Sequence, residues 1–374
     1  MNPIQDLIRT RKVIVCCGAG GVGKTTTSAA LGLAAASVGK SVLVVTIDPS
    51  KRLAEALGVD RNPERPIPVD IDGLIDKKSE GSLSAWMLDP QLIADRVVER
   101  FSGSNRDAST LMNNPIYQNV TAMVAGMQEY TAVQALYEFI HDDRYDLIIL
   151  DTPPSRDALR FLDAPERASA FLDRRIFNLF VPGEGSAIRR MTTKLLEKVM
   201  DVSFGPDTRR ELQQFFQLFG GLLSHLNHNQ AEMRRFFGGE DVSFLLVTAP
   251  TSAALEETQF FSRRATGELD LDVAGVILNR SLTHCRGWTM PIPGFHEGQD
   301  PVLSAAILKL RQFSLREQEM MEGHLQLKGE LAALSGDKGW VFTLPHLGPD
   351  ASTLDGLSAI AHYMADDEND QYEK

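Results

Sequence analysis

The chain has 374 residues, of which 43% are hydrophobic and 24% charged, and its formal net charge is -12 at pH 7. This composition excludes a disordered or fibrous chain, and the length favours one large α/β domain with an insertion, or two domains. The acidic balance argues against a nucleic-acid partner that is held mainly through its phosphates.

Strand and helix signals alternate along the chain. Short apolar, β-branched runs predict strands, and apolar residues at helical spacing predict helices. In chain order we predict strands over residues 13–17, 41–47, 83–88, 145–150, 244–247, 273–278 and 341–344, and helices over residues 24–38, 51–57, 119–140, 252–266, 302–334 and 353–363. The alternation predicts a parallel sheet with helices on both faces and ligand sites at the carboxyl ends of its strands.

One segment interrupts the alternation. Residues 164–237 show helical spacing without a convincing strand, which predicts a helical subdomain inserted into the α/β domain. The α/β domain then comprises residues 1–163 and 238–364. The acidic, polar tail over residues 365–374 is expected to be disordered.

A glycine-rich loop between the first strand and the first helix carries the clearest chemistry. Residues 18–25 read Gly-Ala-Gly-Gly-Val-Gly-Lys-Thr and match the pattern G-x4-G-K-[ST]. The pattern lies between a predicted strand and a predicted helix, which is the context expected of a phosphate-binding loop. Such loops turn backbone N–H groups toward phosphate oxygens, at the positive end of the following helix. Lys24 is expected to bridge the β- and γ-phosphates of ATP, Thr25 to ligate Mg²⁺ and Thr26 to reach the α-phosphate. The remaining nucleotide contacts are predicted at Gly20, Gly21, Val22 and Gly23.

The fold class predicted from this loop is a P-loop NTPase with a mainly parallel sheet flanked by helices. Two aspartates that close strands next to the loop extend the site. Asp151 is expected to hold Mg²⁺ through water, and Asp48 to orient or deprotonate the attacking water. The alternative for each carboxylate is a helix-capping role.

Four motifs in order resemble one known family. They are the loop over residues 18–27, Asp48-Pro49-Ser50, the Asp151-Thr152-Pro153-Pro154 segment with residues 159–162, and Asn279 after a strand. Together they resemble the ArsA-like ATPases, which comprise the arsenite-pump ATPase and the tail-anchored-protein targeting ATPases. The resemblance covers most of the chain, about residues 12–363.

The resemblance implies roles for individual residues. Asp48 corresponds to the family's catalytic carboxylate in switch I, and Asp151 to the switch II aspartate. Asn279 corresponds to the residue that reads adenine, and Pro345 resembles the second adenine-contacting segment. The resemblance also implies a dimer that sandwiches ATP and joins two helical subdomains into one apolar surface when it closes.

The chain departs from the family at the phosphate loop. Ala19 stands where the family places a signature lysine that reaches the partner's phosphates. Either another cation replaces it, or cross-subunit activation is weaker, or a paralogous partner supplies the charge. Candidate substitutes are Lys51, Arg52 and Arg156, although solvated surface charge is the competing interpretation for each.

The cysteines also depart from the family. Cys285 is alone, so that it cannot form a paired-cysteine zinc site. Cys16 and Cys17 are expected to point to opposite faces of a strand, which disfavours a shared metalloid site. Three cysteines give no disulfide framework, no stretch approaches the ~20 apolar residues of a membrane span, and we therefore expect a cytoplasmic protein with at most peripheral membrane contact.

The predicted insertion suggests a client. Ten of the eighteen phenylalanines lie between Phe161 and Phe237, which fits either an apolar client groove or an ordinary helical core. Eleven basic against eight acidic residues over 164–237 fit a solvated face, or contact with acidic lipid or an acidic partner.

We thus predict a Mg²⁺-dependent ATPase that acts as a dimeric nucleotide switch and carries or regulates a hydrophobic or membrane-associated client. The partner is a second copy or a paralogous ATPase. The alternatives are a regulatory ATPase paired with a paralogue, or a ParA/MinD-like positioning ATPase, which the acidic tail disfavours. An oxyanion-pump motor is disfavoured by the cysteine pattern.

Overall fold

The fold is taken from a computed structural model of the chain. It describes residues 2–47, 52–59, 65–74, 79–89, 95–96, 98–99, 102, 104–114, 117, 139–140, 144–154, 211, 214–215, 235–267, 269, 271–285, 301–335, 339–347, 353–366 and 372–373. Most of the predicted insertion over residues 164–237, and of the predicted helix over residues 119–140, lies outside these ranges.

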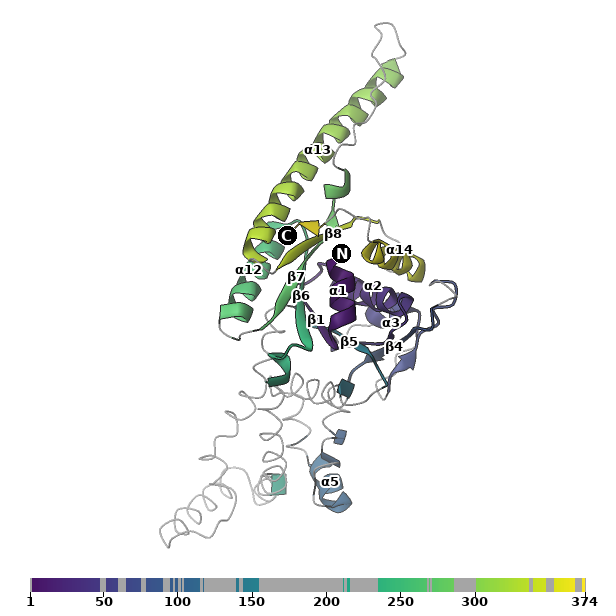
Figure 1. Ribbon diagram of the computed structural model, residues 1–374, viewed down its shortest axis with the longest axis vertical. Coiled ribbons are helices and arrows are strands. Elements are labelled where there is room, and N and C mark those ends of the chain that lie inside the picture. Colours follow the sequence, from purple (N-terminus) through teal and green to yellow (C-terminus); the bar gives the residue numbers. More distant parts are fainter. Residues whose placement is uncertain are drawn as a thin grey trace.

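A single sheet organises the described chain (Figure 1). Its strands are β1 (Val13–Cys17), β2 (Ser41–Thr46), β3 (Ile67–Pro68), β4 (Ser82–Met87), β5 (Leu147–Asp151), β6 (Val242–Thr248), β7 (Val273–Ser281), β8 (Trp340–Pro345) and β9 (Tyr372–Glu373). They lie in the order β3-β4-β2-β5-β1-β6-β7-β8-β9. All pairings are parallel except those of the two edge strands, β3 with β4 and β9 with β8. The predicted mainly parallel sheet is therefore confirmed.

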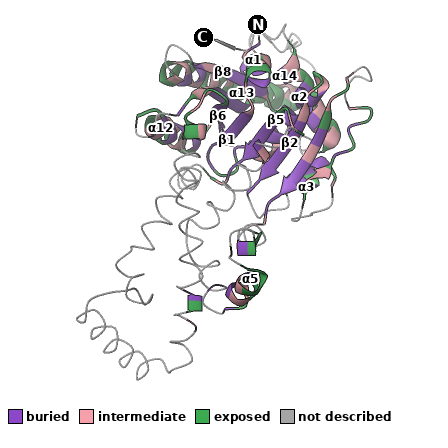
Figure 2. Ribbon diagram, turned by 60° about the horizontal axis from the view of Figure 1, so that its bottom comes forward, coloured by how far each residue is buried: buried purple, intermediate pink, exposed green. Residues whose placement is uncertain are grey.

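Helices cover both faces of the sheet, as predicted. The described helices are α1 (Pro3–Thr10), α2 (Lys24–Ser37), α3 (Arg52–Leu57), α5 (Asn105–Met112), α12 (Ser252–Gly267), the short 3-10 turn η1 (Thr283–Cys285), α13 (Pro301–Ser335) and α14 (Leu354–Ala365). Figure 2 shows the buried strands between helices on both sides, with α5 drawn apart from the sheet.

Alternate residues of each strand enter two separate hydrophobic clusters. Ile14 and Cys16 of β1 point toward the face that α1, α2, α3 and α14 cover. Val15 and Cys17 point toward the face that α12 and α13 cover. The two cysteines therefore lie on opposite faces of the strand, as the period of two residues predicted.

The described phenylalanines of the predicted insertion bear on the client-groove interpretation. Phe215 and Phe237 are buried in the hydrophobic cluster on the α12/α13 face, and Phe236 packs against the same cluster. For these three residues the structure shows core packing. The other seven phenylalanines between Phe161 and Phe237 lie outside the described ranges.

Several elements were not predicted. Helix α1 begins after Asn2, whose Oδ1 accepts the Ile4 N–H at 2.9 Å and whose Nδ2 donates to the Met364 carbonyl oxygen at 2.7 Å. An Asn N-cap followed by proline is a recognisable start signal that the sequence analysis passed over. The two-residue strands β3 and β9 carry no local signal, since only their partner strands define them.

Candidate functional site

The glycine-rich loop joins β1 to α2, and two of its glycines are fixed by close neighbours. A Cβ atom on Gly18 would lie 2.0 Å from the Val247 carbonyl oxygen. Gly23 has φ +95°, and its Cβ would lie 2.2 Å from Nδ2 of Asn279. Only glycine satisfies both the positive φ and the close approach at position 23. The loop thus passes tightly between the ends of β6 and β7.

The first turn of α2 opens into the concave side of this loop. Gly23 is the N-cap residue of α2, and it has no side chain with which to cap the first-turn N–H groups. Uncapped N–H groups and the positive end of the helix dipole form a site for an anion. The backbone alone therefore provides the main element of a phosphate site.

Lys24 lies across the loop. It is only 8% exposed, and its Nζ donates a hydrogen bond to the Ala19 carbonyl oxygen at 2.7 Å. The ammonium group is thus held at the mouth of the loop. Ala19 itself packs in a small apolar cluster with Val22 and Val247, so that this position contributes no charge.

A carboxylate and two hydroxyls meet beside the loop. Oδ2 of Asp151, at the end of β5, accepts hydrogen bonds from the Thr25 hydroxyl at 2.8 Å and the Thr46 hydroxyl at 3.0 Å. Asp151 is fully buried, so that these donors offset part of its desolvation. Next along the chain, the Thr152 hydroxyl donates to the Cys16 carbonyl oxygen at 2.8 Å and fixes the turn after β5 to β1.

Asn279 is tied to the loop. Its Nδ2 donates to the Val22 carbonyl oxygen at 2.8 Å, and its Oδ1 accepts the Arg280 N–H at 2.9 Å. Asn279 is buried and does not line the cavity described below. Pro345, the other predicted base contact, pairs with Ser281 at the end of β8 and also lies outside the cavity lining.

A cavity of about 550 Å³ opens above the loop. This volume lies in the range of sites for small ligands and cofactors. Its lining consists of Gly20, Gly21, Gly23, Lys24, Thr25, Thr26, Arg52, Glu55, Ala56, Thr152, Pro154 and Arg280. The structure therefore brings together most of the predicted phosphate loop and Arg52, one of the three candidate cations.

Three predicted residues lie outside the described residues: Asp48, Lys51 and Arg156. Conversely, Arg280 lines the cavity although the sequence analysis did not select it. It is the one non-glycine residue with positive φ in the described chain, at 59°. A conformation of this kind is costly and often marks a functional site. Its signal in the sequence was its place directly after Asn279.

Cys16 and Cys17 are buried thiols, and the described residues around the cysteines hold no metal-binding group. Burial raises the pKa of Cys16 and of Cys17 to about 12, so that both remain thiols near neutral pH. Among the described residues no group of three or more His, Cys, Asp or Glu side chains is placed to hold a metal ion. The disfavoured metalloid site therefore finds no support in this part of the chain.

The donor set fits a nucleoside triphosphate with Mg²⁺. The hydroxyl of Thr25 and the carboxylate of Asp151 are hard oxygen donors, which Mg²⁺ prefers, and Mg²⁺ keeps several waters in such sites. The glycine loop, Lys24 and the start of α2 provide donors for phosphate oxygens. Chemically, the arrangement can hold a phosphate chain and neutralise charge that develops on it.

Comparison with known proteins gives consistent matches. The sequence model of a family described as anion-transporting ATPase matches residues 11–286. The chain is similar to ATPase GET3 of Malassezia globosa, with 25% identity over 304 residues, 76% of this chain and 80% of that protein. It is similar to ATPase get3 of Schizosaccharomyces pombe, with 27% identity over 276 residues, 72% and 74% of the two chains. A protein of Aquifex aeolicus, provisionally named arsenical pump-driving ATPase 1, is 30% identical over 162 residues, 41% and 38% of the two chains.

Proposed function

The chain belongs to the anion-transporting ATPase family, the ArsA-like ATPases, and is an ATP hydrolase; from this premise we propose that it is a Mg²⁺-dependent nucleotide switch. It lacks the family's signature lysine, since Ala19 occupies that position. The observation that carries the proposal is the hydrogen bond between Thr25 and Asp151 beside the uncapped start of α2. It joins the two expected Mg²⁺ ligands at the mouth of the phosphate loop.

Each residue of the site has a distinct task in this proposal. The N–H groups of Gly20 to Thr26 and the Lys24 ammonium bind and orient the phosphates. Thr25 and Asp151 would hold Mg²⁺, which would supply positive charge to offset the charge of the phosphates. Asp48 orients the attacking water and accepts its proton.

Two segments convert nucleotide state into movement. Residues 48–52 follow β2, residues 151–156 begin at the last residue of β5, and these strands are neighbours in the sheet. Contacts with the γ-phosphate order both segments, and its loss releases them. The Thr46 hydroxyl donates a hydrogen bond to Asp151 at 3.0 Å. This bond links the carboxyl ends of β2 and β5, from which the two segments continue.

The output of the switch is the carriage or regulation of a hydrophobic or membrane-associated client by a dimer. This part rests on the family, whose targeting members act in that way, and on the apolar residues over 164–237. Because Phe215 and Phe237 are core residues, the client surface would lie elsewhere in the insertion. None of the described helices combines the length and apolarity that a membrane span requires.

A regulatory ATPase that pairs with a paralogue is the second candidate. Ala19 packs against Val247 and Ala249 instead of carrying a charge across the dimer. A paralogous chain with a lysine at this position would supply the missing charge to the shared site. Arg52 and Arg280, which line the cavity, are internal candidates for the same task.

An affinity pull-down distinguishes the two candidates. The Asp48→Asn variant retains ATP because binding is intact and hydrolysis is slowed, and it is loaded with Mg-ATP before capture from native cytoplasm. Enrichment of proteins with one apolar terminal segment supports the client switch. Recovery of a second ATPase alone favours the regulatory pair. Lys24→Ala, which removes the phosphate ligand, is the matched control and is expected to retain neither.

A further inference from the structure

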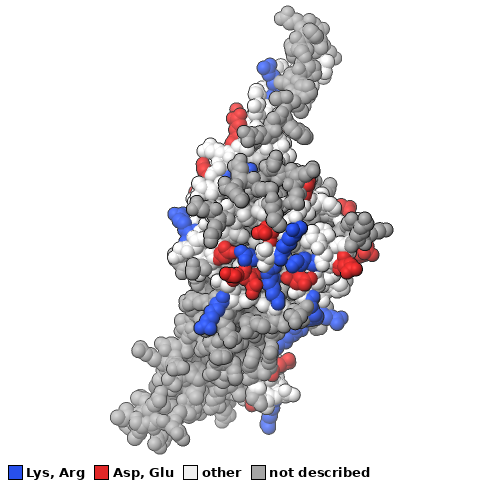
Figure 3. Space-filling view, viewed as in Figure 1, with Lys and Arg blue, Asp and Glu red and all other residues white. Residues whose placement is uncertain are grey.

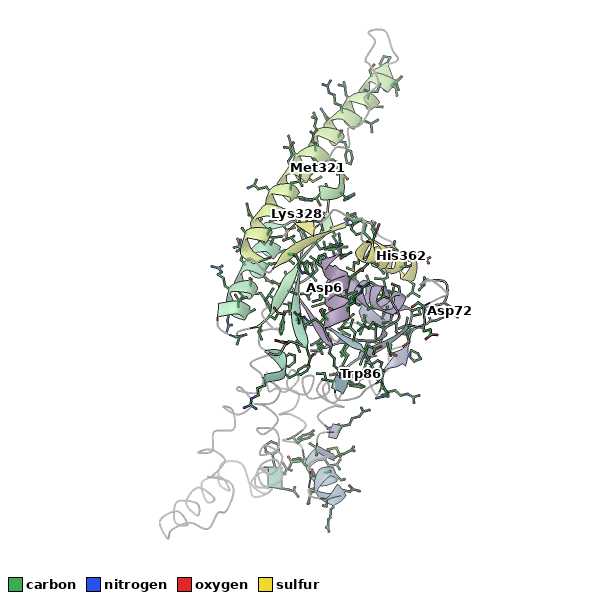
Figure 4. All side chains as sticks on the ribbon, in the orientation of Figure 1. Asp6, Asp72, Trp86, Met321, Lys328 and His362 are labelled. Atoms are coloured by element: carbon green, nitrogen blue, oxygen red, sulfur yellow. The ribbon has the colours of Figure 1, made fainter. Side chains whose placement is uncertain are left out.

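The N-terminal half of α13 projects away from the sheet (Figure 1). The other end of α13 is anchored, because Leu331 is buried in the hydrophobic cluster on the α12/α13 face and Leu327 packs against it. Lys328 and Met321 mark the transition from the anchored to the projecting part (Figure 4). We call residues 301–316 the projecting end of α13.

The projecting end is apolar and exposed. Six large apolar side chains on it have between 49% and 75% of their surface exposed, namely Val302, Leu303, Leu308, Leu310, Phe313 and Leu315. Soluble chains seldom leave contiguous apolar groups of this extent in water unless a partner covers them. Most of the described exposed large apolar residues of the chain lie here.

The apolar residues form a pattern along the helix. Val302, Leu310 and Phe313 share one face of α13 because helical residues three, four or eight apart lie on the same side. Leu308 and Leu315, seven residues apart, lie on another side. The first eight residues, Pro301 to Leu308, contain serine as their only polar side chain and extend about 12 Å. The tip is therefore apolar around its circumference.

The charge of the projecting end is uniformly positive. It contains Lys309, Arg311 and Arg316 and no acidic residue, whereas the chain as a whole has a net charge of -12. Over the α/β body, by contrast, basic and acidic side chains lie side by side (Figure 3). Lys309 and Arg311 come within the first turn behind the apolar tip, and Arg316 about two turns behind it. An anionic, partly apolar surface complements this arrangement.

We infer that the projecting end of α13 is a peripheral membrane anchor that takes an anionic lipid surface. The apolar tip enters the boundary between headgroups and acyl chains, which lies about 5–10 Å deep. Lys309, Arg311 and Arg316 then lie at the level of the lipid phosphates and extend their charges toward them. This inference does not rest on the client proposed above, since it uses only residues on α13.

A second copy of the chain fits this surface less well. An antiparallel pair would place Lys309 of one copy near Arg316 of the other. A parallel pair would leave Lys309 and Arg311 without an acidic partner, because residues 301–316 contain none and the first carboxylate beyond them is Glu317. Charge complementarity therefore favours lipid over self-association.

Vesicle flotation with the full-length protein tests the inference. Wild-type protein is expected to float with vesicles that contain phosphatidylglycerol, and much less with pure phosphatidylcholine or at high salt. The apolar variant Leu303→Ser/Leu308→Ser, which changes two leucines of the tip, is expected to bind about a hundredfold more weakly. The charge variant Lys309→Gln/Arg311→Gln/Arg316→Gln is expected to lose about a hundredfold on the anionic vesicles.

The controls separate this inference from folding and from the proposed function. Leu334→Ser alters an exposed leucine at the anchored end of the same helix and is expected to float like wild type. All variants are expected to keep wild-type ATP turnover in solution, which shows that they are folded. Equal flotation of the apolar variant and wild type overturns the inference. A second result also overturns it: neither protein floats, and the wild type is a dimer whereas the apolar variant is a monomer. The projecting end would then pair two copies of the chain.

Discussion

The contact between Gly23 and Asn279 allows a quantitative prediction. In Gly23→Ala, the new Cβ would lie 2.2 Å from Nδ2 of Asn279, and alanine would have to adopt φ +95°. The positive φ costs about 1 kcal/mol. Displacing Asn279 breaks its hydrogen bonds to Val22 and Arg280, at about 1 kcal/mol each. We expect the free energy of unfolding to fall by about 3 kcal/mol.

A double-mutant cycle separates the two contributions. Asn279→Ala alone removes the same two hydrogen bonds and is expected to cost about 2 kcal/mol. In Gly23→Ala/Asn279→Ala the clash has gone, so that only the backbone cost is added, for a total of about 3 kcal/mol. The two changes are therefore coupled by about 2 kcal/mol.

The assay is urea unfolding monitored by tryptophan fluorescence. The slope of the free energy of unfolding against urea concentration should be the same in all variants, which checks that the comparison is valid. Gly21→Ala is the matched control, because Gly21 has φ +77° and no atom lies within 4 Å of its Cβ position. It is expected to cost about 1 kcal/mol and to be additive with Asn279→Ala. Additive costs for the Gly23 pair would refute the contact between the loop and β7.

Two further predictions follow from the site. Burial raises the pKa of Cys16 and Cys17 to about 12 from 9.0, so that only about one molecule in ten thousand carries either thiolate at pH 8. Native protein is therefore expected to react with a thiol reagent at Cys285 alone and to expose two more thiols on unfolding; rapid reaction of all three contradicts the burial. Arg280→Ala is expected to raise the Kd for ATP about tenfold by calorimetry, since it removes a cation from the cavity. An unchanged Kd would remove Arg280 from the site.

The phosphate loop and the sheet could be predicted because their signals are local. Glycines, Lys24 and Thr25 stand together in the chain, and buried strands read as short apolar runs. The two-residue edge strands could not be predicted, because they exist only through their partners. The N-terminal helix had a local signal in Asn2 and Pro3, which the predicted elements did not include.

The prediction of the site was less complete where residues meet through the fold. That Asp151 accepts hydrogen bonds from both Thr25 and Thr46 depends on the register of β2 against β5. The contact of Asn279 with Val22 depends on how β7 approaches the loop. Arg280 follows Asn279 directly, but its place in the cavity lining comes with a positive φ of 59°, which the sequence does not predict for an arginine. Which cation replaces the charge missing at Ala19 likewise depends on how distant residues meet in the fold.

ATP hydrolysis by wild type and Lys24→Ala, with and without Mg²⁺, tests the central claim most directly. Wild type is expected to release phosphate only when Mg²⁺ is present, because Thr25 and Asp151 act on the nucleotide through the metal. Lys24→Ala is expected to lose both tight ATP binding and turnover. Phosphate release at the wild-type rate by Lys24→Ala, or an equal rate after Mg²⁺ is chelated, would contradict the assignment of the site.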